Sequence, residues 1–159
     1  MSGAREAAKV AKKLNIEEVS AVVVDCAYKL HVELGPGLLE SVYEVVLARW
    51  LSDRGLMVER QKPVAIRVGD LKFDEGFRAD LVIENCLLIE LKSVEDLAPV
   101  HSKQVLTYLR LLKLPLGLLI NFGAPTFKEG IKRIANGHSN FASSRLRVNS
   151  GSSGVLGPE

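Results

Sequence analysis

The sequence from position 78 to position 92 reads RADLVIENCLLIELK, two apolar runs joined by a polar turn around Asn85. Strand side chains alternate between the two faces of a sheet, so Glu90 and Lys92 share one face of the second run. If Asn85 lies in the middle of the turn, Asp80 and Glu90 are direct cross-strand partners. The opposite face takes the apolar residues Ala79, Leu81, Ile83, Leu87, Ile89 and Leu91. The stretch therefore predicts a β-hairpin with two carboxylates and one ammonium group on one face.

The length of the turn decides whether the two carboxylates meet. A two-residue loop at 84–85 would pair Asp80 with Ile89 and move the carboxylates to opposite faces. We therefore predict an odd-length turn or a bulge. Asn85 is the residue expected at positive φ, because Asn tolerates the left-handed region.

Two facing carboxylates favour a bound cation. Cross-strand partners stand about 5 Å apart, and two negative charges at that distance repel each other unless a cation lies between them. The alternative is a solvated outer face on which Glu90 pairs with Lys92. Both runs are apolar enough for central strands, which favours a divalent-cation site at Asp80 and Glu90.

The flanking sequence predicts helices around a sheet. Apolar residues at three- and four-residue steps indicate a helix over 16–34 that ends at Gly35-Pro36-Gly37, and a second helix from 39 to about Gly55. The helical period returns over 99–113, and 127–135 is ambiguous between strand and helix. Strands are predicted at 64–68, 71–73, 78–84, 86–92 and 116–121. This order, with about four antiparallel strands before the third helix, predicts an α/β (α+β) domain with a mixed central sheet flanked by helices.

Polar residues on the predicted helices extend the candidate site. Glu40 begins the second helix, where an acid is also favourable simply because it faces the helix N-terminus. His101, Gln104 and Tyr108 follow an i, i+3, i+7 spacing, which makes a polar stripe on the third helix. Such a stripe can merely face solvent, but Gln and Tyr are neutral donors suited to a phosphate or a carboxylate. His101 is better explained as a structural residue than as a metal ligand.

Length and composition limit the class of protein. A chain of 159 residues fits one domain, and a hydrophobic share of 47% is too high for a disordered chain. The net charge of +2 gives no global positive field, and no apolar run approaches the ~20 residues of a membrane span. Two cysteines do not make a disulfide framework, which favours a reducing cytoplasmic setting. We expect a domain over 15–138, an N-terminal extension over 1–14 and a flexible Ser/Gly-rich tail over 139–159.

Three motifs resemble a known group of proteins. Residues 37–43, GLLESVY, match the GxxExxY signature of bacterial GxxExxY proteins. Asp80 followed by the Glu90-Leu91-Lys92 run resembles the core motif of the PD-(D/E)xK nuclease superfamily, with Ala79 in place of the proline. The spacing of Gln104 and Tyr108 resembles a motif of its RecB-like branch. The resemblance extends from about Asn15 to Gly137.

This resemblance implies a restriction-endonuclease-like fold and Mg²⁺-dependent hydrolysis of nucleic acid, DNA in preference to RNA, with Mn²⁺ as a substitute ion. It implies that Asp80 and Glu90 hold the metal, with Glu40 as a further carboxylate. Lys92 would act on the attacking water or the phosphate. Supporting or phosphate-positioning roles would fall to Gln104, Tyr108, His101, Arg78 and Tyr43. A homodimer is left open, because a small nuclease needs some means of engaging two strands.

Two other functions remain open from the sequence. The first is a non-catalytic nucleic-acid-binding or regulatory module on the same fold, which need not bind a divalent ion. The second is a metal-dependent hydrolase of a small phosphorylated molecule, which would act on nucleotides but not on polymers.

Overall fold

The computed structural model describes residues 12–137, which form four helices and five strands. In chain order these are α1 (Ile16–Leu34), α2 (Glu40–Asp53), β1 (Val58–Val68), β2 (Leu71–Ile83), β3 (Leu87–Lys92), α3 (Pro99–Leu112), β4 (Leu116–Asn121), α4 (Phe127–Gly130) and β5 (Ile131–Ala135). The predicted tail over 139–159 and the first eleven residues of the predicted extension lie outside the described residues. No helix of residues 12–137 combines the length and apolar character that a membrane crossing requires.

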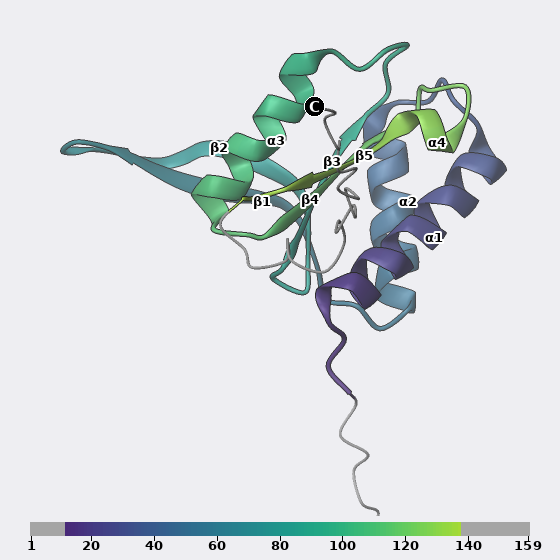
Figure 1. The fold of residues 1–159 in the computed structure, drawn as a ribbon, viewed down its shortest axis with the longest axis horizontal. Coiled ribbons are helices and arrows are strands. Elements are labelled where there is room, and N and C mark those ends of the chain that lie inside the picture. The colour runs from purple at the N-terminus through teal and green to yellow at the C-terminus, as the bar shows by residue number, and fades with distance from the viewer. Residues whose placement is uncertain (1–11, 138–159) are drawn as a thin grey trace, which may run out of the picture.

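The strands form one mixed sheet in the order β1-β2-β3-β4-β5. The first three strands run antiparallel, β3 and β4 are parallel and linked through α3, and β5 returns antiparallel to β4. In Figure 1, α1 and α2 lie on one side of the sheet and α3 lies on the other. The predicted fold class, a mixed sheet flanked by helices, is confirmed.

The sheet has an apolar core on each face. Residues of α1 and α2 pack on one face against alternate residues of the central strands, among them Leu81, Leu87, Ile89 and Leu118. Residues of α3 pack on the other face, against Ala79, Val82, Leu88 and Leu119. Strands β3 and β4 are therefore buried on both faces, which is why their sequences are continuous apolar runs.

The helix ends follow local signals in the sequence. Asn15 and Glu18 form a reciprocal capping box at the start of α1, with both hydrogen bonds at 2.9 Å. The ambiguous stretch 127–135 contains one element of each kind, the single turn α4 followed by β5, and Thr126 caps that turn. The helical and the strand pattern of apolar residues are mixed in this stretch because the chain changes from helix to strand at Ile131.

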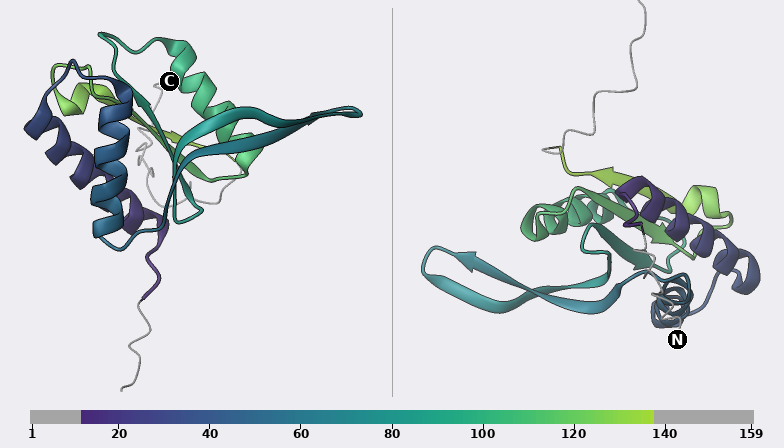
Figure 2. Two further views of the ribbon diagram at one scale, coloured as in Figure 1. Left: turned by 180° about the vertical axis from the view of Figure 1, so that it is seen from behind. Right: turned by 90° about the horizontal axis from the view of Figure 1, so that it is seen from below.

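The prediction of four antiparallel strands before α3 is wrong, because 71–73 and 78–83 belong to one strand, β2. Residues 74–76 interrupt the apolar pattern and so predict a gap between two strands. In the structure they are exposed, but β2 continues through them and pairs with β1 on both sides. The register shifts between Val64 and Ile66, which pair with Phe77 and Phe73, so one residue of β1 faces three of β2. Figures 1 and 2 show the result, a long β1–β2 hairpin that projects from the body of the domain.

The loop that follows β3 is fixed by the end of β4. The side chain of Asn121, 2% exposed, accepts the Val94 N–H at 3.0 Å and donates to the Val94 carbonyl at 2.9 Å. It also accepts the Gly123 N–H at 3.0 Å. A Cβ on Gly123 would lie 2.2 Å from the Val94 carbonyl oxygen. This contact holds the backbone directly after Lys92.

We expect Gly123→Ala to destabilise the protein by about 3 kcal/mol, because the added methyl group meets rigid backbone rather than a movable side chain. The melting temperature in a thermal denaturation scan should fall by about 10 °C. Gly137→Ala is the matched control, since a Cβ there meets no atom within 4 Å, and it should change stability by less than about 0.5 kcal/mol. Equal melting temperatures for the two variants would contradict the tight contact with Val94.

Candidate functional site

At one end of the β2–β3 pairing, the side-chain carboxylates of Asp80 and Glu90 accept hydrogen bonds from backbone N–H groups, in place of backbone carbonyls. Regular pairing ends at Leu81 and Ile89. One step further, the Asp80 N–H donates to Oε1 of Glu90 at 3.2 Å, and the Leu91 N–H donates to Oδ2 of Asp80 at 2.8 Å. Each acid is thus held by the backbone of the opposite strand.

The turn of this hairpin has three residues, 84–86, as an odd-length turn requires. Asn85 has a φ of 52°, which confirms the expected left-handed position. Glu84 is also left-handed, with a φ of 51°. Its N–H donates to the Met57 carbonyl at 3.0 Å and its carboxylate accepts the Met57 N–H at 2.6 Å, which fixes the turn.

The predicted alternation of faces is wrong at Ala79. Leu81 and Ile83 pack on the α1 and α2 side as expected, but Ala79 packs with Val82 on the α3 side. The alternation therefore slips by one residue at Asp80. The slip lets the Asp80 side chain line a cavity on the α2 side of the sheet while it stays next to Glu90.

Burial and the neighbouring acid raise the pKa of Glu90 to about 9. Its side chain is buried, which disfavours the charged form, and the adjacent charge of Asp80 acts in the same direction. The ammonium group of Lys92, two residues along β3, partly lowers the pKa again. Glu90 therefore keeps its proton at neutral pH beside Asp80.

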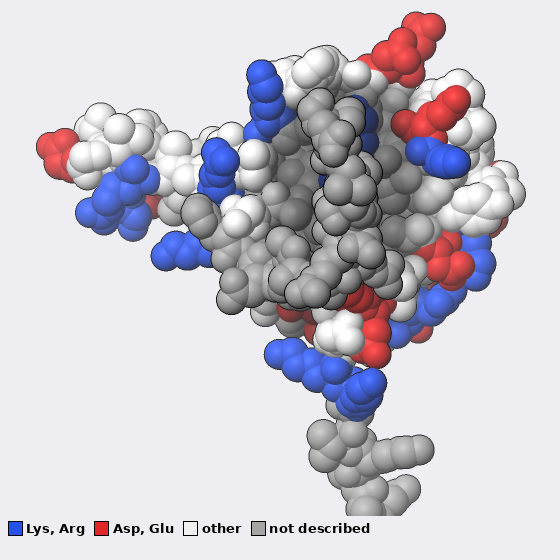
Figure 3. Space-filling view, viewed as in Figure 1, with Lys and Arg blue, Asp and Glu red and all other residues white. Residues whose placement is uncertain are grey.

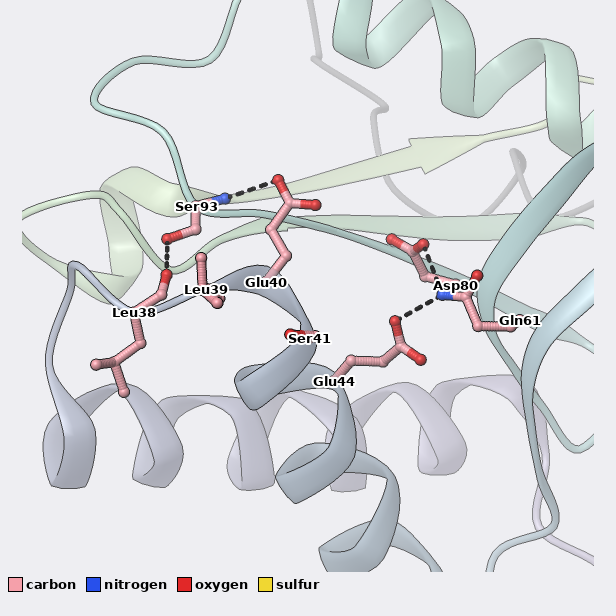
Figure 4. Close-up of a pocket in the computed structure, with 8 residues that line it drawn as sticks. All are labelled: Leu38, Leu39, Glu40, Ser41, Glu44, Gln61, Asp80 and Ser93. Atoms are coloured by element: carbon pink, nitrogen blue, oxygen red, sulfur yellow. Dashed lines mark hydrogen bonds between the residues drawn. The ribbon is translucent and has the colours of Figure 1, made fainter.

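A cavity of about 500 Å³ opens beside Asp80 (Figure 4). Glu40 lines the same cavity, and its Oε1 accepts the Ser93 N–H at 3.4 Å. The hydroxyl of Ser93 donates to the Leu38 carbonyl at 2.6 Å. These contacts join the start of α2 to the backbone just after Lys92.

The cavity also contains two polar residues that the sequence does not single out, Glu44 and Gln61. Glu44 is only 6% exposed, and its two oxygens accept from Arg60 at 3.2 Å and from Gln61 at 2.7 Å. The Gln61 amide reaches Asp80 as well, at 3.5 Å. The only sequence signal for Glu44 is its position four residues after Glu40, on the same face of α2.

Gln104 and Tyr108 lie on the α3 side of the hairpin. The Gln104 amide donates to the Tyr108 hydroxyl at 2.8 Å, and the Tyr108 ring stacks on Phe77 with a centroid distance of 3.9 Å. Burial raises the pKa of Tyr108, and the nearby charge of Glu90 raises it further. The phenol is therefore a neutral donor close to the acidic pair.

The structure gives three predicted supporting residues other contacts. Nδ1 of His101 accepts the Ala98 N–H at 3.0 Å, so His101 closes the first turn of α3. Arg78 is exposed and pairs with Glu75. Tyr43 is fully buried, donates to the Gly35 carbonyl at 2.5 Å and stacks on Phe122. Tyr43 therefore positions the turn before α2.

The residues expected to hold a metal ion are Asp80, Glu90 and Glu40. Among residues 12–137, no three His, Cys, Asp or Glu side chains are grouped so as to hold a metal ion as they stand. Asp80 and Glu90 lie next to each other, and Glu40 lines the same cavity as Asp80. Their carboxylate oxygens are nevertheless the hard donors that Mg²⁺ prefers. A cation at this pair would also offset the repulsion from Asp80, which adds to the effect of burial in raising the pKa of Glu90.

The mixed sheet flanked by helices, with an acidic pair on adjoining central strands and Lys92 two residues further, defines a restriction-endonuclease-like domain. The family model described as the PD-(D/E)XK nuclease superfamily matches residues 17–134, and the chain belongs to that superfamily. Membership indicates nuclease chemistry on nucleic acid, in a superfamily that generally uses divalent metals. The comparisons with curated proteins and with solved structures gave no match.

The raised pKa of Glu90 predicts that the metal-free protein loses stability as pH rises. The folded state holds this proton up to about pH 9, whereas an exposed Glu in the unfolded chain releases it near 4.5. Between these values the folded state binds more protons, so the free energy of unfolding decreases with pH. The slope is about 1.4 kcal/mol per pH unit for one proton, so pH 8 should cost about 4 kcal/mol relative to pH 5 in EDTA, which lowers the melting temperature by roughly 12–20 °C.

Glu90→Gln should remove most of this pH dependence and raise the melting temperature at pH 8. Glu33→Gln, which changes an exposed acid on α1, is the control and should keep the wild-type dependence. A Glu90→Gln variant with the same slope as wild type would show that the pH dependence arises elsewhere.

Proposed function

We propose that this protein is a divalent-metal-dependent nuclease that hydrolyses phosphodiester bonds of DNA. The observation that carries the proposal is the pair of backbone-held carboxylates, Asp80 and Glu90, with Lys92 two residues further on β3. Superfamily membership supports the reaction class. Metal identity, DNA preference and the residue roles are our inference.

Asp80 and Glu90 would hold the ion, Mg²⁺ or Mn²⁺ in its place. A bound divalent ion supplies a more acidic water molecule and neutralises charge on the phosphate. Glu90 has to release its proton for this role, because a ligand carboxylate is anionic. Asp80 needs no rearrangement, since the Leu91 N–H already fixes one of its oxygens.

Lys92 would act on the reacting groups. Side chains two apart on a strand share a face, so its ammonium group lies beside Glu90, whose pKa it lowers. A fixed positive charge there can orient the attacking water and stabilise the charge that develops on the phosphate. Tyr108, held by Gln104, is a neutral donor that can support the phosphate from the α3 side.

The finer assignments rest on motifs and charge. We place the protein with the GxxExxY proteins in the RecB-like branch on the motifs at 37–43, 80–92 and 104–108. We place it in a cytoplasmic setting because its two cysteines do not make a disulfide framework. Figure 3 shows both signs of charge spread over one face, with Lys and Arg side chains along the projecting β1–β2 hairpin. This mixed surface fits backbone contacts at a few phosphates rather than strong nonspecific binding. A homodimer would supply one cutting site for each strand.

One observation favours a second candidate, a nucleic-acid-binding module without catalysis. Within the described residues no three His, Cys, Asp or Glu side chains are grouped so as to hold a metal ion. A two-carboxylate site relies on water and substrate oxygens to complete the coordination of Mg²⁺. Metal binding and cleavage therefore have to be measured separately.

Cleavage of end-labelled single- and double-stranded DNA and RNA in Mg²⁺ tests the proposal. We expect wild type to cut DNA, and Asp80→Asn and Glu90→Gln each to lower the rate at least a hundredfold because they weaken metal binding. Lys92→Ala should lower the rate at saturating Mg²⁺ by about 10²–10³-fold and leave metal affinity nearly unchanged. The three losses should not add, because each one disables the same assembly.

Lys132→Ala, which removes an exposed cation from β5 at the other edge of the sheet, is the matched control and should cut at the wild-type rate. A Lys92→Ala variant that cuts as fast as wild type would overturn the proposed role of the lysine. A wild-type protein that binds Mn²⁺ but cuts no nucleic acid would be the non-catalytic module. One that hydrolyses only nucleotides would be the small-molecule hydrolase.

A further inference from the structure

Gln61 has an unusual backbone for a strand residue. It lies within β1 between the pairs Arg60–Leu81 and Lys62–Ala79, which places it opposite Asp80. Its φ is 47°, in the left-handed region that side chains other than glycine rarely adopt. The other described non-glycine residues with positive φ are in turns or at a helix end: Glu84, Asn85 and Lys113. Strain of this kind is often found where a side chain has to be aimed at a functional group.

The left-handed backbone brings two neighbouring side chains to one acceptor. Consecutive strand residues normally point to opposite faces, yet Arg60 and Gln61 both bind the carboxylate of Glu44, through different oxygens. Glu44 is buried, and each of its two oxygens accepts one of these donors. It therefore holds the Gln61 amide in one orientation.

The same amide nitrogen reaches the acidic pair. Nε2 of Gln61 lies 2.7 Å from Oε2 of Glu44 and 3.5 Å from Oδ1 of Asp80, so its two hydrogens serve two carboxylates (Figure 4). The other oxygen of Asp80 accepts the Leu91 N–H. Both oxygens of Asp80 thus have a donor, and Glu44 from α2 is connected to Asp80 on β2 through β1.

We propose that Gln61 is a positioning residue for Asp80, and that Glu44 holds the Gln61 amide in the orientation that this requires. The inference deepens the proposed nuclease function and rests on it. A neutral amide suits the position, because it restrains the carboxylate without adding a positive charge that would oppose a metal ion. Lysine or arginine there would compete with the ion for Asp80.

Replacing Gln61 with glycine distinguishes a positioning role of its side chain from a purely structural one. Gln61→Gly removes the amide but relieves the backbone strain, since glycine adopts the left-handed region freely. If Gln61 has only a structural role, its replacement should lower the stability of the fold. If it is a strained positioning residue, its replacement should weaken metal binding without lowering stability. Lys113→Gly is the matched control, because Lys113 is an exposed left-handed residue, with a φ of 57°, at the far end of α3.

The experiment titrates Mn²⁺ into the full chain without nucleic acid and follows the free-ion signal by electron paramagnetic resonance, alongside thermal denaturation in EDTA. We expect Gln61→Gly to weaken Mn²⁺ binding by about five- to tenfold with an unchanged or higher melting temperature. Glu44→Ala should weaken binding in the same direction. Lys113→Gly should keep the wild-type Mn²⁺ affinity while its melting temperature stays level or rises.

Cleavage adds a second readout. In Gln61→Gly the Mg²⁺ concentration for half-maximal rate should rise by the same five- to tenfold, and saturating Mg²⁺ should restore most of the rate. In Lys92→Ala the Mg²⁺ concentration for half-maximal rate should stay nearly unchanged, while the rate at saturating Mg²⁺ should stay low. A Gln61→Gly variant with wild-type Mn²⁺ affinity, or one that loses stability together with affinity, would overturn the inference. Failure of wild type to bind Mn²⁺ would instead overturn the proposed function itself.

Discussion

The site depends on one exchange of hydrogen bonds, in which Asp80 and Glu90 each accept a backbone N–H from the opposite strand. Regular antiparallel pairing would have used these N–H groups for backbone carbonyls. The exchange fixes the acids at the end of the paired region of β2 and β3, where the strands would otherwise continue as an ordinary ladder. Burial of Glu90, together with the charge of Asp80 beside it, raises the pKa of Glu90 so far that it keeps a proton at neutral pH. Much of the remaining structure holds this unfavourable pair in place.

The sequence was sufficient for the elements whose cause is local. The helical stripes, the Gly-Pro-Gly break and the Asn85 turn follow from periodicity and from residues with special backbone preferences. The break expected between the predicted strands 71–73 and 78–84 was wrong, because an exposed hairpin needs no apolar alternation to continue pairing. The slip of alternation at Asp80 was not visible either. It arises from the exchange of hydrogen bonds with Glu90, which is a tertiary interaction.

The GxxExxY motif likewise shows that a sequence pattern does not reveal the role that each of its residues has in the folded structure. Both Glu40 and Tyr43 resemble functional residues in the sequence, but only Glu40 lines the cavity. Tyr43 is buried on Phe122, and its hydroxyl joins the Gly35 carbonyl to the Leu38 N–H. Its contribution is therefore the shape of the turn from which Glu40 begins α2. Spacing alone cannot separate a residue at a site from one that builds the turn beside it.

The connection from Glu44 through Gln61 to Asp80 explains why these elements form one unit. A left-handed glutamine costs on the order of 1–3 kcal/mol, and a buried Glu44 needs partners for both oxygens. Each feature is unfavourable alone. Together they compensate each other, because the left-handed backbone places the Gln61 amide where it donates a hydrogen bond to the buried Glu44 carboxylate. Helix α2, the edge strand β1 and the β2–β3 hairpin are thereby fixed relative to one another by polar contacts. An apolar contact at the same place would pack as well, but it would leave the orientation of the Asp80 carboxylate undefined.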